Sequence, residues 1–176
     1  MDRRSFLKLS LAGSAALSAA GLTATLTGCS GAPTPATGFQ FLRDADVTLF
    51  RALIPQVLDG IALDAAAAEE CLRRIDLGCF LLEAPAQSEV RKLFDLLNTG
   101  LLRRLTTGVS KSWDQAGAEE VQTFLARWHD SSVGLFNAGY RVLVKLVSVS
   151  YFCMPQSRKF SGYPGPLDYM YKAVNA

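Results

Sequence analysis

Side chains that could carry out catalysis or bind a cofactor are few in this sequence and do not form the usual sets. His129 is the single histidine, so a haem attachment motif, a zinc quartet and a Ser-His-Asp triad all lack members. The glycines fall at expected helix ends or breaks rather than in the cluster that cradles a phosphate. We therefore expect no catalytic, cofactor or metal site in this chain.

His129 itself stands between Trp128 and Asp130, at the end of an expected helix. Histidine side chains near a helix C-terminus can bond to the last carbonyl groups and interact favourably with the helix dipole. We expect that role for His129, with a catalytic base as the alternative.

The first eight residues have the features of a targeting signal. Two adjacent arginines, Arg3 and Arg4, are followed by Phe6, Leu7 and Lys8. A basic segment with such an apolar shoulder looks like a twin-arginine signal, which a receptor reads on proteins that are exported in the folded state. The sequence therefore predicts export through the twin-arginine translocon.

An uncharged segment, residues 9–28, follows this basic start. It is diluted with glycine, serine and threonine, whereas a permanent membrane helix of about 20 residues would be more apolar. We interpret residues 1–28 as a removable signal peptide. The alternative is an amino-terminal anchor helix that stays in place.

The expected signal peptide closes on Leu26-Thr27-Gly28-Cys29, which resembles the lipobox of bacterial lipoproteins. Cleavage after Gly28 would make a lipid-modified Cys29 the first residue of the mature protein. Two or three acyl chains hold a protein on a membrane, whereas one chain binds only reversibly. We expect a periplasmic protein anchored to the membrane by lipid, with a flexible tether over residues 29–38. An ordinary cleavage site of small residues is the alternative.

The rest of the chain has the length and charge of one ordinary domain. The chain has 176 residues and a formal charge of +2, and removing the leader leaves equal numbers of basic and acidic residues. A balanced charge does not suggest the basic face that nucleic acid requires. We expect a single domain over residues 39–176, long enough to bury a core.

Apolar residues in this domain recur with the period of amphipathic helices, so we expect an all-α fold of about five helices. The expected helices cover about residues 44–58, 64–82, 88–107, 114–128 and 132–152. Pro55 predicts a kink or break in the first, Pro85 bars continuation of the second, and Gly100 interrupts the third. The last is the most apolar, interrupted only by Arg141 and Lys145, so we expect a central helix with one narrow face in water.

Cys71 and Cys79 lie eight residues apart within one expected helix, where they would be about 12 Å apart. That separation exceeds the roughly 7 Å limit for a disulfide, so we expect two buried free thiols. Cys153 is then left over in an exported protein, which invites bonding to another chain. A buried free thiol is the alternative for Cys153.

After Pro155 the chain becomes rich in proline and glycine, and we expect an irregular tail over residues 159–171. Four aromatic residues in this stretch are too many for an unattached coil. The tail should therefore pack, either onto a partner or onto this domain.

Several stretches carry a resemblance to a known family. They are the twin-arginine leader, Leu49–Pro55, Trp128-x-x-Ser131-Ser132, Tyr151-x-x-x-Pro155 and Gly162–Pro166. Over about residues 46–163 the chain resembles the gluconate 2-dehydrogenase small-subunit family, whose members accompany flavin-dependent dehydrogenases of the glucose-methanol-choline type. The lipobox departs from this pattern, because many leaders of the family have an ordinary cleavage site.

The resemblance implies a noncatalytic subunit that escorts a folded FAD-dependent dehydrogenase out of the cytoplasm and stabilises it in the envelope. FAD would be bound by the partner and not by this chain, and a multihaem cytochrome c is a further candidate partner. Cys153 is the candidate for an interchain disulfide. The candidate interface consists of Cys153, Tyr163, Pro164, Gly165, Pro166 and Tyr169.

The competing interpretation is a free-standing helical lipoprotein of the envelope with a structural or scaffolding role. A flavin dehydrogenase without its own signal in the neighbouring reading frame would favour the escort. A third interpretation, that the chain is itself an oxidoreductase, requires a cofactor site that the sequence does not offer.

Overall fold

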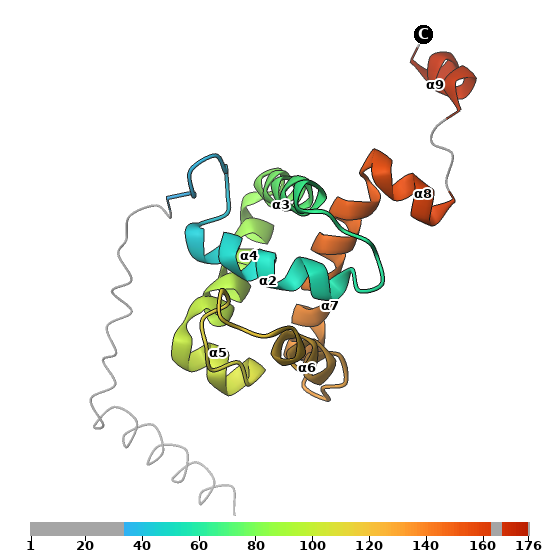
Figure 1. The fold of residues 1–176 in the computed structure, drawn as a ribbon. Coiled ribbons are helices and arrows are strands. Elements are labelled where there is room, and N and C mark those ends of the chain that lie inside the picture. The colour runs from blue at the N-terminus through green and yellow to red at the C-terminus, as the bar shows by residue number, and fades with distance from the viewer. Residues whose placement is uncertain (1–33, 163–166, 176) are drawn as a thin grey trace, which may run out of the picture. The chain divides into compact units, whose positions relative to one another are not determined.

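The computed structural model describes residues 34–162 and 167–175, and within these ranges the chain is helical without any β-strand (Figure 1). The predicted all-α class is therefore confirmed. The helices are α2 (Asp44–Val57), α3 (Ala65–Phe80), α4 (Ala84–Asn98), α5 (Gly100–Thr107), α6 (Ala118–His129), α7 (Gly134–Phe152), the 3₁₀ turn η1 (Pro155–Ser157), α8 (Arg158–Ser161) and α9 (Asp168–Val174).

Some of the residues singled out in the sequence lie outside the described ranges. These are the leader residues Arg3, Arg4, Phe6, Leu7, Lys8, Gly28 and Cys29, and the tail residues Tyr163, Pro164, Gly165 and Pro166.

The helices begin and end close to their predicted positions where a local signal marks the boundary. The Asp64 carboxylate accepts the Ala67 backbone N–H at 2.7 Å and caps α3. At α6 the prediction was four residues early, because Glu120 instead accepts the Gly117 N–H at 3.0 Å and the helix begins at Ala118. Pro55 lies within α2, which continues for two residues beyond it.

The predicted third helix is two helices. Pro85 lies in the first turn of α4, where its missing N–H costs nothing, so the helix begins before the predicted Ser88. Thr99 is extended, with φ −75° and ψ 114°, and separates α4 from α5 just before Gly100. Residues 84–107 therefore contain two helices where one was predicted, so the expected count of about five is too low.

The tail also contains more regular structure than predicted. Residues 158–161 form α8 and residues 168–174 form α9. Glycine and proline are concentrated in residues 162–166, whereas the seven residues of α9 contain neither. The expectation of an irregular tail is therefore wrong for these two helices.

The core is organised around α2 as well as α7. Helix α2 contacts α3, α4, α6 and α7, and Figure 1 shows it running between α3 and α6. Its side chains Leu49, Phe50, Leu53 and Ile54 are buried, each exposing 1% or less of its surface. Burial of such large apolar groups is the main favourable term in folding.

Helix α7 packs less completely than predicted. It contacts α2, α3 and α6, which bury Leu143, Val147 and Tyr151. Leu135 and Val149 on another side remain 71% and 52% exposed. The expectation that only a narrow face with Arg141 and Lys145 meets water is therefore wrong, because the neighbouring helices cover one side of α7 only.

Helices α6 and α7 cross at very short range. A Cβ atom added to Gly139 would lie 2.6 Å from the Trp128 ring, a distance that real side chains do not adopt. The Trp128 ring stacks on Phe136, and its indole N–H donates to the Thr106 carbonyl at 2.9 Å. Glycine is thus required at this position by packing.

Candidate functional site

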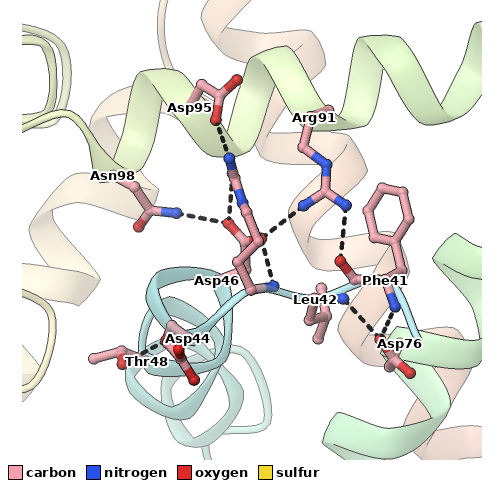
Figure 2. A network of polar contacts seen from close by, with 10 residues as sticks. Phe41, Leu42, Asp44, Asp46, Thr48, Asp76, Arg91, Asp95 and Asn98 are labelled. Carbon is pink, nitrogen blue, oxygen red and sulfur yellow. Dashed lines mark hydrogen bonds and ion pairs between the residues drawn. The ribbon is translucent and has the colours of Figure 1, made fainter. Parts of the chain in front are cut away.

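Two buried carboxylates tie the start of the domain to its helices (Figure 2). Asp76 on α3 accepts the backbone N–H groups of Gln40, Phe41 and Leu42, each at 2.8 Å. These three residues precede α2 and have no helical partners for their amides. Asp76 therefore holds this segment against α3.

The second carboxylate, Asp46 in the first turn of α2, is fully buried. It accepts the Arg43 backbone N–H at 2.9 Å, the Arg91 guanidinium at 3.0 Å and the Asn98 amide at 2.7 Å. The Arg43 side chain also bonds to Asp46 and forms an ion pair with Asp95 at 2.6 Å. The network joins α2 to α4, as Figure 2 shows.

Arg91 connects the contacts of Asp46 with those of Asp76. Its guanidinium donates to the Phe41 carbonyl at 2.7 Å and lies 3.8 Å from the centre of the Phe41 ring. Hydrogen bonding to Asp46 raises the pKa of Arg43, whereas burial and the nearby Arg43 charge lower the pKa of Arg91.

Every carboxylate oxygen of Asp46 and Asp76 already accepts a hydrogen bond. Such saturated buried groups stabilise a fold and leave no open position for a ligand. We interpret the network as structural.

His129 lies at the end of α6, as predicted, but its side chain has a different partner. Its Nδ1 atom lies 2.7 Å from the Asp130 carboxylate, and its ring meets Tyr140 edge to face. The His129 carbonyl accepts the Asn137 side-chain amide instead. A polar hollow of about 420 Å³ next to His129 and Tyr140 contains no cysteine or serine nucleophile.

The cysteines differ in accessibility. Cys71 and Cys79 are free and fully buried, as predicted, and burial raises their pKa values to about 11 and about 12. Cys153 directly follows α7 and is free and exposed. The alternative of a buried Cys153 thiol is therefore wrong.

An apolar depression, which we name the outer groove, lies between α3, α4 and α7. It consists of two hollows of about 690 and 390 Å³ that share Glu89, Val90 and Val142. Leu81 and Val149 line the first hollow, in which Cys153 also lies, and both are more than half exposed. Contiguous exposed apolar surface of this kind is typical of interaction sites.

Sequence reasoning missed this groove although α7 carried a signal for it. A helix that is apolar on nearly all sides needs neighbours on nearly all sides. The described chain supplies α2, α3 and α6 around α7 and leaves one side open. Of the predicted interface residues in the described ranges, Cys153 lies in the groove and Tyr169 is an exposed residue of α9.

Among the described residues, none of the helices has both the length and the hydropathy to span a bilayer. The same part of the chain contains no cluster of three histidine, cysteine or acidic side chains suited to a metal ion. Comparison with family models, with curated proteins and with solved structures found no match for this chain.

Proposed function

We propose that this chain is a noncatalytic subunit that escorts a folded FAD-dependent dehydrogenase through the twin-arginine pathway and stabilises it in the cell envelope. The observation that carries the proposal is a twin-arginine type of leader joined to a helical domain with an exposed apolar groove. The leader addresses folded cargo, and the groove offers a surface for it.

The order of events follows from flavin chemistry. A flavoenzyme takes up FAD in the cytoplasm and must cross the membrane with its cofactor already bound. A dehydrogenase without a signal of its own can do so only in complex with a chain that has one. After export, lipid on Cys29 would retain the complex at the membrane, and a multihaem cytochrome c could accept the electrons.

Cys153 and the tail residues are the proposed contacts with the dehydrogenase. Cys153 is exposed, so its thiol is accessible for a disulfide with the partner once both chains reach an oxidising compartment. Tyr169 is exposed on α9. Tyr163, Pro164, Gly165 and Pro166 lie outside the described residues and stay proposed contacts on the basis of their residue types.

The test is to express this chain with a flavin dehydrogenase that lacks its own export signal, the proposed partner, and to replace Arg3 and Arg4 with lysine. We expect exported flavoprotein to fall at least tenfold, measured as flavin fluorescence and dehydrogenase activity in the periplasm. Lys8→Arg, which leaves the arginine pair intact, is the matched control. Undiminished export of the flavoprotein by the Arg3→Lys, Arg4→Lys variant would refute the escort role.

A further inference from the structure

The outer groove follows α7 along most of its length. Its lining includes the α7 residues Leu135, Gly139, Val142, Leu146 and Val149, and Cys153, which directly follows the helix. Steps of four and three residues alternate along this series, which is the spacing of a coiled-coil seam. The series thus has the period of a surface on which another helix packs, and Leu135 and Val149 are exposed within it.

Helix α7 therefore has two apolar seams. One contains Leu143 and Val147 and is buried in the core. The other faces the groove, whose walls include Leu77 from α3 and Leu93 from α4. A helix lying in the groove would contact three helices at once, as helices do inside a bundle.

The length of the seam sets the size of the occupant. Leu135 and Cys153 are eighteen residues apart, which corresponds to about 27 Å along a helix axis. An occupant helix of about five turns would cover the seam from end to end.

The charges around the groove indicate a further property of the occupant. Arg74 is paired with Glu70 at 2.8 Å, and Lys92 is paired with Glu89 at 2.7 Å. Lys145 lines the groove and has no ion pair with any other described residue. The groove therefore keeps one positive charge beside its apolar floor, and a carboxylate on the occupant would complement it.

The concave shape favours a protein helix over a lipid surface. Binding to a bilayer interface uses apolar side chains that protrude into the acyl region. Two adjoining hollows of about 690 and 390 Å³ instead accept side chains from another molecule.

We propose that the outer groove binds an amphipathic helix of the flavoprotein subunit, with its apolar stripe along the second seam of α7 and a carboxylate opposite Lys145. This inference rests on the proposed function and assigns the docking surface within it. The groove, rather than the tail alone, then determines the affinity of the complex.

The test compares matched variants of the full chain for binding to the flavin dehydrogenase used in the export test. Val149→Glu changes a groove residue that is 52% exposed, and Val133→Glu changes a residue outside the groove that is 51% exposed. Lys145→Glu and Arg141→Glu reverse exposed charges one helical turn apart, and only Lys145 lines the groove. Thermal unfolding checks that each variant is folded.

We expect Val149→Glu to raise the Kd at least tenfold and Lys145→Glu to raise it at least threefold. The effect of Lys145→Glu should shrink at high salt, because the ion pair it breaks is screened. Val133→Glu and Arg141→Glu should bind within twofold of the wild type.

The outcomes separate the two proposals. A wild-type chain that does not bind the flavoprotein refutes the escort role and the groove assignment together. Wild-type binding with equal Kd values within each variant pair refutes the groove assignment alone. A dimer of the free subunit that only Val149→Glu dissociates would assign the groove to a second copy. That result would contradict the proposal.

Discussion

Replacement of Asp76 with asparagine tests how strongly the buried carboxylate holds the start of the domain. The asparagine oxygen can still accept the Phe41 and Leu42 amides, which share one carboxylate oxygen in the wild type. The side-chain NH₂ would then face the Gln40 N–H, which loses its acceptor. A lost bond to a charged group costs about 1.5–3 kcal/mol, and an unsatisfied buried amide costs about 1–3 kcal/mol.

Gln40 is partly accessible to water, so the total loss of unfolding free energy from these two costs should be near the lower end of the range, at about 3 kcal/mol. For a domain of this size that loss corresponds to a fall in Tm of about 6–12 °C. The assay is urea and thermal unfolding, with amide hydrogen exchange at residues 40–42 as a local readout. Glu70→Gln on the same helix is the control, because its exposed pair with Arg74 is worth less than about 1 kcal/mol.

Two results would refute this reasoning. One is an Asp76→Asn variant that is no less stable than Glu70→Gln. The other is unchanged hydrogen exchange at residues 40–42 in a destabilised variant, since the stability would then be lost elsewhere.

Three further predictions concern packing, thiol reactivity and the pH dependence of stability. Gly139→Ala should destabilise the domain by about 1–3 kcal/mol in urea unfolding, because the new methyl group overlaps Trp128, whereas Gly78→Ala meets open space and should be neutral or stabilising. Equal effects would contradict the close α6–α7 crossing. Cys153 should react with a thiol reagent at pH 8, while Cys71 and Cys79 should react only after unfolding, since their raised pKa values keep the thiolate rare. Folded Cys71 and Cys79 retain their protons above pH 9, where the unfolded thiols lose theirs, so stability should fall as the pH rises from about 9 to about 11. Rapid labelling of all three native thiols would contradict this assignment.

Some of the candidate functional residues could be inferred from the sequence, and others only from the fold. A translocation signal is read as a peptide, so the proposed export role of Arg3 and Arg4 could be inferred without a fold. The exposure of Cys153 and its place in the outer groove required the positions of α3, α4 and α7. Their relative placement is not contained in any local pattern.

The sequence by itself determined the helical class and most helix positions, because apolar periodicity, the Asp64 cap and the Gly100 break are local signals. The tertiary structure alone decided the contacts of Asp46 and Asp76, whose partners include residues 34 to 52 positions away. It also decided which side of α7 is covered. A hydrophobic helix indicates only that burial is favourable, and the number of neighbours that fit around it depends on how the whole chain packs.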